Sequence, residues 1–445
     1  MSEEVQDQVP KQNIVAQPEH ISSHNSEQEK TPNESRKERI VILDQELSQY
    51  EGPKNDRELE IATEETRQQF AHANETFDLT NETKQQLGDK MNGEIARARE
   101  RMVKYQEILQ EDRVIKAQEL ISAIGGEVNL GIEPYKQFNP NKQERFLIQK
   151  GQFQETDVVF KVGEKVDIKT IQNESRNLRI IEQAPVETGN KLDVNFVRQI
   201  GDVFEDDKMC GLATEHIQDD SELKPNLSAE QKTVVIGKTI DNLHRLVVTD
   251  EALKSGLSFH DGEKIVNDAQ YFLETLSREG IIDAENGKLL QDEFRSAFSS
   301  LMAERPVFAH GDAHGDNIIV KRSGDDELSI FLLDFEGLRI SNQYHDWSEI
   351  LNKSVFLKHL QVNRPELFEP IKGNVENMWL DDSVVFDEQQ IIDKVTEGDP
   401  DKARNFRLTR TYDMLTRIMN DRNSENPLAQ ERTRLYLEYI QKEVK

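Results

Sequence analysis

Residues 307–351 constrain the fold of this chain more than any other stretch. Short apolar runs separated by polar loops predict buried strands, at residues 307–309, 318–320 and 330–333. The loop after the first run holds Asp312 and Asn317, and the third run ends at Asp334 and Glu336. Because strand ends hold polar side chains rigidly beside solvent, we expect chemistry at these positions.

The spacing of these polar residues is typical of phosphoryl transfer. Asn317 follows Asp312 by five positions (317 − 312), and Asp334 follows Asn317 by seventeen (334 − 317). Phosphoryl transfer needs a carboxylate beside the acceptor hydroxyl, and ligands for a divalent cation that bridges the phosphates. An amide oxygen and a carboxylate suit Mg²⁺ better than zinc. The stretch therefore predicts a magnesium-dependent phosphotransferase site.

The loop and the third run together resemble the HGDxHxxN and hDFE signatures of the aminoglycoside phosphotransferase and choline kinase superfamily, in His310-Gly311-Asp312-Ala313-His314-Gly315-Asp316-Asn317 and Leu333-Asp334-Phe335-Glu336. The resemblance implies an α+β, two-lobed protein-kinase-like fold, with a small β-rich N-lobe and a large, mainly helical C-lobe. It implies that Asp312 is the catalytic base and that His310 and His314 shape its loop. Asn317 and Asp334 would bind Mg²⁺. Residues 344–347 resemble the helix start that braces this loop.

The same resemblance predicts a nucleotide-binding N-lobe ahead of the loop. Residues 157–162 predict a strand that carries Lys161, and residues 168–182 predict a helix that carries Glu174. The thirteen positions between them (174 − 161) suit an ion pair that holds Lys161 against nucleotide phosphates. Lys150, at the end of the preceding strand, remains the alternative lysine.

The first two strands of this lobe are expected at residues 128–138 and 144–149, and residues 136–145 between them contain no glycine. A glycine-rich phosphate cradle is therefore not expected there. Residues 209–217 resemble the hinge between the lobes, where backbone groups around Glu215 and Ile217 would bind the adenine of ATP, with GTP as the other nucleotide. An ordinary core strand is the alternative interpretation.

Composition predicts the outer domain boundaries. Residues 1–90 hold about 20 acidic and 10 basic residues and few apolar ones, which predicts a largely disordered acidic extension. Residues 56–90 are helix-prone, so the fold class includes a disordered and partly helical N-terminal extension. Helical periodicity strengthens afterwards and stops at Gly125 and Gly126. We expect four parts: the extension at 1–90, a helical segment at 91–126, the N-lobe and hinge at 127–218, and the C-lobe at 219–445.

Charge and cysteine usage exclude several classes of protein. A net charge of −29 argues against sequence-independent nucleic-acid binding, which needs clustered Lys and Arg. Cys210 is the single cysteine, so a disulfide within the chain is excluded and a reducing compartment fits. No apolar run approaches the roughly 18 residues of a membrane span. We therefore expect a cytoplasmic protein with neither nucleic-acid nor membrane partners.

The sequence as a whole predicts an ATP-dependent phosphotransferase that moves the γ-phosphoryl group to a hydroxyl of a small molecule, as the aminoglycoside enzymes do. An inactive kinase-like scaffold that acts through its N-terminal extension is the alternative. A metal-dependent hydrolase would instead use the residues His310, Asp312, His314 and Asp334. Candidates for the acceptor pocket are Trp379, Asp381 and Asp382.

Overall fold

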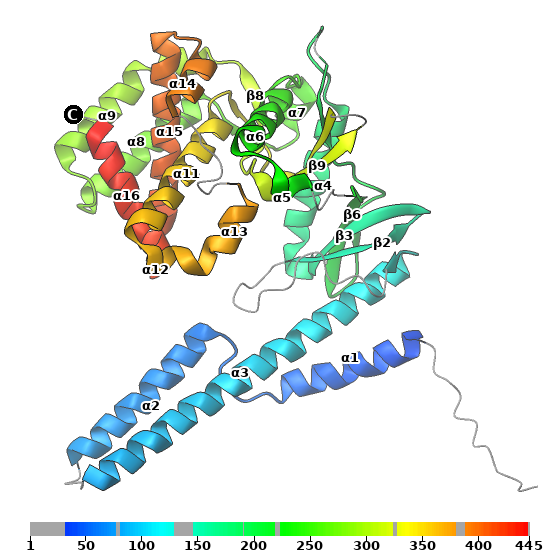
Figure 1. Cartoon of the computed structure of the whole chain (residues 1–445), viewed down its shortest axis with the longest axis vertical. Helices are drawn as coiled ribbons and strands as arrows, with labels where there is room; N and C mark the ends of the chain where they lie inside the picture. The colour runs from blue at the N-terminus through cyan, green and yellow to red at the C-terminus, as the bar shows by residue number, and fades with distance from the viewer. Residues whose placement is uncertain are drawn as a thin grey trace, which may run out of the picture. The chain divides into compact units, whose positions relative to one another are not determined.

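The computed structural model describes residues 32–76, 81–128, 146–189, 191–218, 223–323, 327–379 and 388–443. The chain divides into two compact units, Met1–Asp112 and Arg113–Lys445. The first contains α1 (Pro32–Ser48), α2 (Asp56–Thr76) and most of α3 (Asn81–Ala123), as drawn in Figure 1.

The structure describes helices at residues 32–48 and 56–76, which agrees with the helical part of the expected extension, while the disorder expected within residues 1–90 stays a prediction. The apolar patch at residues 40–43 explains α1. Ile40 and Leu43 are 8% and 0% exposed, while Val41 and Ile42 face outward at 66% and 46%. Residues three apart lie on one helix face, so this spacing suits a helix that buries one side. Residues 1–31 lie outside the described part.

The N-lobe is an antiparallel five-stranded sheet in the order β1-β2-β3-β6-β5. Its strands are β1 (Glu127–Val128), β2 (Phe146–Phe153), β3 (Thr156–Glu164), β5 (Phe204–Glu205) and β6 (Met209–Glu215). The C-terminal end of α3 packs its Ala117, Leu120 and Ile121 against the buried face of β3, which presents Val158 and Phe160. The predicted strand at 157–162 is confirmed as β3. The strand predicted at 144–149 overlaps β2, while residues 129–145, which include most of the strand predicted at 128–138 and the turn after it, lie outside the described part.

Helix α4 (Ile168–Gln183) follows β3 and confirms the helix predicted at residues 168–182. It lies beside the N-lobe sheet and also contacts the short turn η3 (Phe335–Gly337) of the C-lobe. The side chain of Asn177 donates to the carbonyl oxygen of Phe335 at 2.8 Å. Helix α4 therefore links the two lobes directly.

Two small sheets of the C-lobe carry the polar loop and the strand ends singled out in the sequence. In the first, β10 (Glu327–Leu332) pairs antiparallel with β9 (Ile318–Ser323) and parallel with β4 (Val194–Phe196). In the second, β11 (Arg339–Asn342) lies between β7 (Ser258–His260) and β8 (Pro306–Ala309). The strands predicted before and after the polar loop, β8 and β9, thus belong to different sheets, and the loop connects them. Since β4 joins the C-lobe, residues 127–218 do not lie wholly in the N-lobe.

Helices form most of the C-lobe, at α5 (Leu223–Asn226), α6 (Ala229–His244), α7 (Asp250–Lys254), α8 (Gly262–Arg278), α9 (Ala284–Ser296), α10 (Phe298–Met302), α11 (His345–Asn363), α12 (Pro365–Phe368), α13 (Lys372–Asn377), α14 (Glu388–Thr396), α15 (Pro400–Asp421) and α16 (Pro427–Glu443). A capping box starts α6: Gln231 N–H donates to Ser228 Oγ at 3.2 Å, and Ser228 N–H donates to Gln231 Oε1 at 2.8 Å. Ala297 is both the C-cap of α9 and the N-cap of α10. The predicted α+β, two-lobed fold class is confirmed.

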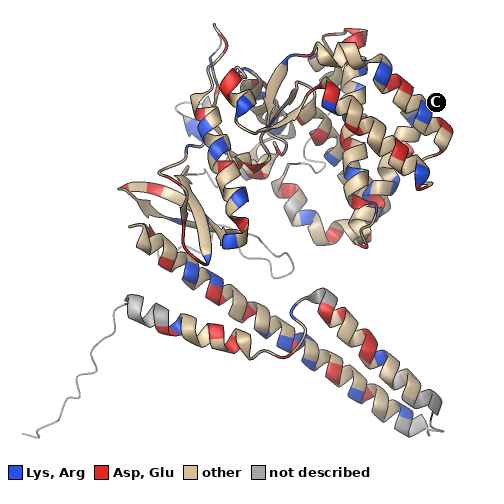
Figure 2. Ribbon diagram, turned by 180° about the vertical axis from the view of Figure 1, so that it is seen from behind, with Lys and Arg blue, Asp and Glu red and all other residues tan. Residues whose placement is uncertain are grey.

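Acidic and basic side chains alternate along the helices, as Figure 2 shows. Within the residues the structure describes, no helix combines the length and apolar character needed to cross a bilayer.

Candidate active site

The loop that follows β8 is anchored by Asp346, at the start of α11. The backbone N–H groups of His310 and Gly311 donate to the two carboxylate oxygens of Asp346, at 3.0 and 2.8 Å. Burial opposes the charge on Asp346, but His244 at 3.6 Å and these N–H groups outweigh it and lower its pKa. Gly311 has φ +76°, and a Cβ there would lie 2.9 Å from the carbonyl oxygen of Gly337. Glycine is therefore required at this position.

His310 joins the loop to the segment that carries Asp334. Its Nε2 donates to the carbonyl oxygen of Leu333 at 2.9 Å, and its ring meets that of Phe335 edge-on at 5.2 Å between centroids. The N–H of Leu333 in turn donates to the carbonyl oxygen of Asn317 at 2.8 Å. Asp334 itself has φ +56°, a left-handed conformation that is uncommon outside glycine and recurs at functional sites.

Asp312 lies among three polar side chains. The Nζ atom of Lys353 lies 2.5 Å from Oδ1, and Nε2 of His314 lies 3.2 Å from Oδ2. The amide nitrogen of Asn317 donates to the carbonyl oxygen of Asp312 at 2.9 Å and to its Oδ2 at 3.3 Å. Burial would raise the pKa of Asp312, but His314 and Lys353 hold it well below its usual range. Asp312 is thus a carboxylate at neutral pH.

Lys161 on β3 is the centre of a second group of charges. Its Nζ atom lies 2.7 Å from Glu174 Oε2 on α4, 3.3 Å from Asp334 Oδ1 and 3.5 Å from Glu336 Oε2. The ion pair predicted between Lys161 and Glu174 is therefore present, and Lys161, not Lys150, makes it. Its partners come from both lobes.

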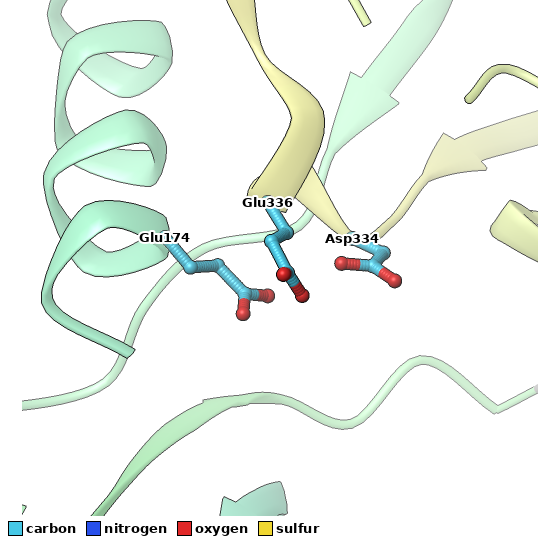
Figure 3. Close-up of side chains that lie close together, drawn as sticks. All are labelled: Glu174, Asp334 and Glu336. Atoms are coloured by element: carbon cyan, nitrogen blue, oxygen red, sulfur yellow. The ribbon is translucent and has the colours of Figure 1, made fainter. Parts of the chain in front are cut away.

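Burial opposes the charge on Lys161, but the three carboxylates outweigh burial and raise its pKa. For Glu174 the balance is reversed: burial, with Asp334 and Glu336 close by, raises its pKa to about 7. The three carboxylates point toward one space in Figure 3, and their oxygens lie within 4.8 Å of one another. Glu174 is paired with Lys161, and the oxygens of Asp334 and Glu336 are hard ligands of the kind that Mg²⁺ prefers.

Among the described residues, this is the one group of His, Cys, Asp and Glu side chains close enough to share a metal ion. His310 bonds a carbonyl oxygen and His314 faces Asp312, so these histidines do not converge with Asp334. The hydrolase alternative, which needs such convergence, is not supported.

The segment expected to bind adenine follows β6. The N–H of Glu215 donates to the carbonyl oxygen of Arg198, and the N–H of His216 donates to that of Asp157, both at 2.9 Å. The side chain of Glu215 accepts from the N–H of Arg198 at 2.9 Å. These contacts engage two of the three N–H groups at 215–217, so Ile217 is the remaining candidate donor. The adenine contacts of Glu215 and Ile217 stay a prediction.

Trp379, a candidate for the acceptor pocket, lies beside the loop that follows β8: the carbonyl oxygen of its neighbour Met378 accepts from the N–H of Gly315 at 2.9 Å. Trp379 is almost fully buried. Asp381 and Asp382 lie outside the described residues.

Two residues of the site were not assigned from the sequence. Glu336 stands at the predicted strand end, and the DFE motif could have marked it as a third carboxylate. No local sequence pattern marks Lys353 as a site residue, because only the packing of α11 brings it to Asp312, which is 41 positions away. It also contacts Glu349, one helical turn earlier, at 3.3 Å.

Comparison with known proteins agrees with this geometry. Residues 139–356 match the profile of the phosphotransferase enzyme family, and this range includes Lys161, the catalytic loop and Lys353. The resemblance to the aminoglycoside phosphotransferase family is confirmed over that range. No curated protein matches the sequence.

Several solved structures are similar to the fold. Wild-type aminoglycoside 2'-phosphotransferase-IIIa in its GDP complex is 12% identical, with a TM-score of 0.43 over 75% of this chain and 98% of that one. A macrolide 2'-phosphotransferase from Brachybacterium faecium is 13% identical, with a TM-score of 0.44 over 74% and 98%. A thermostable mutant of the aminoglycoside phosphotransferase APH(4)-Ia, in complex with ADP and hygromycin B, is 9% identical, with a TM-score of 0.42 over 72% and 97%.

Proposed function

We propose that this protein transfers the γ-phosphoryl group of ATP to a hydroxyl of a small molecule. The observation that carries the proposal is the position of Lys161, whose ammonium contacts Glu174 of the N-lobe at 2.7 Å and Asp334 of the C-lobe at 3.3 Å. Phosphotransferases need a lysine held against the phosphates beside an acidic metal ligand. Asp334 lies just after β10, and β10 pairs with β9. Asn317 and the loop after β8 lie just before β9 begins.

In this reaction Asp312 orients the acceptor hydroxyl and receives its proton. The hydroxyl oxygen forms a bond to the γ-phosphorus, the bond to the bridging β,γ oxygen breaks, and ADP leaves. A carboxylate with a lowered pKa is a weak base, so Asp312 acts mainly by positioning, as expected for a loose transition state. His310 and His314 hold the loop. Lys353 fixes the carboxylate and adds positive charge where the phosphoryl group passes.

Asn317 and Asp334 would hold Mg²⁺, with Glu336 as a further oxygen ligand. The amide nitrogen of Asn317 is committed to Asp312, which leaves its amide oxygen for the metal. Bound Mg²⁺ neutralises charge on the phosphates. Lys161 steadies those phosphates and Glu174 holds Lys161, while Glu215 and Ile217 flank the adenine of ATP, or the guanine of GTP.

We assign the acceptor to the small molecules with hydroxyl groups, and aminoglycosides are the class to test first because of the family match. The structures similar to this fold include one described in complex with kanamycin and one with hygromycin B. A cytoplasmic setting, which supplies ATP and keeps the buried thiol of Cys210 reduced, fits this role.

The decisive experiment measures thermal unfolding of the full chain with ATP, GTP and Mg²⁺, alone and in combination. A nucleotide at a hundred times its dissociation constant should add about 2.7 kcal/mol to the native state. We expect a shift that requires Mg²⁺ and that Asp334→Ala removes. The absence of any shift would favour the inactive scaffold.

An acceptor screen then follows phosphate transfer from ATP to aminoglycosides, macrolides and sugars. Asp312→Ala should abolish turnover while circular dichroism shows a folded protein that still binds nucleotide. Turnover at the wild-type rate in Asp312→Ala would contradict the assignment of the base.

A further inference from the structure

A positively charged side chain lies beside the proposed base without a carboxylate partner. Arg339, at the start of β11, is half-buried, and its Nε donates to the carbonyl oxygen of Gly337 at 3.1 Å. Its guanidinium group packs on Gly311, the residue before Asp312, where a Cβ would lie 2.9 Å from Cζ of Arg339. No carboxylate among the described residues forms an ion pair with it. Because a guanidinium group has five N–H donors and is always charged, Arg339 can still bind an anion.

Arg339 acts toward helices α11 and α15, which pack against each other (Figure 1). Its charge acts on His345 at the start of α11 and on Asp413 of α15. Nδ1 of His345 lies 3.2 Å from Oδ1 of Asp413, so these two buried groups form an ion pair that adds no net charge. The strongest electrostatic influences on Lys161 and Asp334 come from other groups. Since the attacking and leaving oxygens of phosphoryl transfer are roughly in line, we place Arg339 on the acceptor side of the base and not on the nucleotide side.

Two further cations lie on this side of the base. The Nζ atom of Lys353 lies 2.5 Å from Asp312 Oδ1 and 3.3 Å from Glu349 Oε1, and Nη2 of Arg417 lies 2.7 Å from the same Glu349 oxygen. Burial would raise the pKa of Glu349, but the positive charges around it, Lys353 foremost, outweigh burial and lower the pKa. With Arg339, three cations therefore face two carboxylates, in a chain whose net charge is −29. One positive charge is left for a ligand.

We propose that the acceptor carries a negatively charged group beside the hydroxyl that is phosphorylated, and that Arg339 and Arg417 bind this group. The inference rests on the phosphotransferase function proposed above, in which the hydroxyl oxygen bonds to the γ-phosphorus, its proton goes to Asp312 and ADP leaves. The acceptor class is a hydroxylated organic anion with a carboxylate or a phosphate, because either anion matches the parallel donors of a guanidinium group. Aminoglycosides are polycations, which the positive excess would repel.

The test measures kcat/KM for two matched series of acceptors by release of ADP, corrected for release without acceptor. The first series is glucose, glucosamine, glucuronate and glucose-6-phosphate, and the second is glycerol, serinol, glycerate and glycerol-3-phosphate. Kanamycin is measured beside them as the polycation. In at least one series we expect an anion to exceed its neutral and cationic counterparts and kanamycin at least tenfold, and the better anion identifies the charged group. Any other result, including turnover of no anion at all, would overturn the proposal.

Thermal unfolding of the same preparation separates this failure from failure of the proposed function. A Mg²⁺-dependent shift with ATP, together with a preference for neutral or cationic acceptors, would disprove only the charge of the acceptor. Absence of both the shift and any turnover would disprove the phosphotransferase itself.

Variants locate the anion. Arg339→Gln should lower the ratio of kcat/KM between the best anion and its neutral counterpart about tenfold or more, because the anion loses a charged partner. Arg339→Lys, which keeps the charge, should restore part of this ratio. Arg417→Gln, at an exposed position of α15, should also lower the ratio and decides the matter if Arg339→Gln does not fold.

Arg295→Gln, on the exposed surface of α9, is the matched control and should keep the wild-type ratio. A structural role for Arg339 would lower kcat/KM equally for both acceptors. An unchanged ratio in Arg339→Gln, or in Arg417→Gln if the first variant is unfolded, would therefore refute the assignment.

Discussion

Removing Lys161 should destabilise the protein in a way that depends on pH. In the wild type, Glu174 loses its proton near pH 7, because Lys161 lies 2.7 Å away and compensates the buried charge. In Lys161→Met nothing compensates it, since the Glu174 side chain is 5% exposed. The folded variant then keeps the proton above pH 7, while the unfolded chain has released it near the ordinary value of 4.5.

The magnitude follows from proton linkage. A raised carboxyl pKa costs about 1.4 kcal/mol of stability for each pH unit over which only the folded state holds the proton. The wild type stops losing stability from this group near pH 7, whereas Lys161→Met continues to lose it. The difference in free energy of unfolding between them should therefore grow by about 2.7 kcal/mol from pH 7 to pH 9.

Urea unfolding at pH 7, 8 and 9 measures this difference. The fluorescence of Trp347 and Trp379, the two tryptophans of the chain, reports only on the unit Arg113–Lys445. In Lys161→Met/Glu174→Gln the extra pH dependence should disappear, because Glu174 no longer titrates. A difference that stays constant from pH 7 to pH 9, or a double variant that behaves as the single one, would refute the reasoning. Lys150→Met is the matched control on β2 and should show no such dependence.

Two further predictions concern the C-lobe. Lys353→Met should lower kcat about 10- to 150-fold in the phosphotransfer assay, because a hydrogen bond to a charged group contributes about 1.5–3 kcal/mol. Lys358→Met on the same helix should leave kcat unchanged. If the Lys353→Met and wild-type kcat values are equal, Lys353 takes no part in the reaction. Burial lowers the pKa of His260 to about 3, so only the unfolded chain takes up its proton as pH falls through 6.5. Between pH 7.5 and pH 5, the free energy of unfolding of the wild type should therefore fall by about 2 kcal/mol more than that of His260→Gln. Urea unfolding measures both values, and an equal fall in the two proteins would contradict the prediction.

The sequence was most informative where short-range spacing determines geometry. The residues from His310 to Asn317 form one short loop. Gly311 adopts a positive φ, a backbone conformation that few other residues adopt. The strand and helix that carry Lys161 and Glu174 are adjacent in the chain, so their periodicity and separation, together with the family resemblance, favoured this ion pair over one made by Lys150. These features depend on local backbone preferences.

The features that sequence reasoning missed depend on packing between distant segments. Strand β4 pairs with β10, although Asn195 and Ile330 are 135 positions apart. Lys353 reaches Asp312 only because α11 presents one particular face to the loop. In the N-terminal extension, low apolar content predicted disorder, but Ile40 and Leu43 suffice to give α1 a buried face. The average composition of a segment does not show that a few apolar residues have the spacing of one helix face.

The charges of the described site explain why nucleotide binding should require Mg²⁺. Asp312, Asp334 and Glu336 supply three carboxylates, and Glu174, whose pKa is raised to about 7, supplies a fourth as it loses its proton, whereas Lys161 and Lys353 supply two ammonium groups. The net negative charge would repel the triphosphate of free ATP, and a divalent cation offsets it. A nucleotide that binds equally well without Mg²⁺ would mean that the phosphates lie away from these carboxylates. The thermal-unfolding experiment therefore tests the position of the phosphates as well as the presence of a nucleotide site.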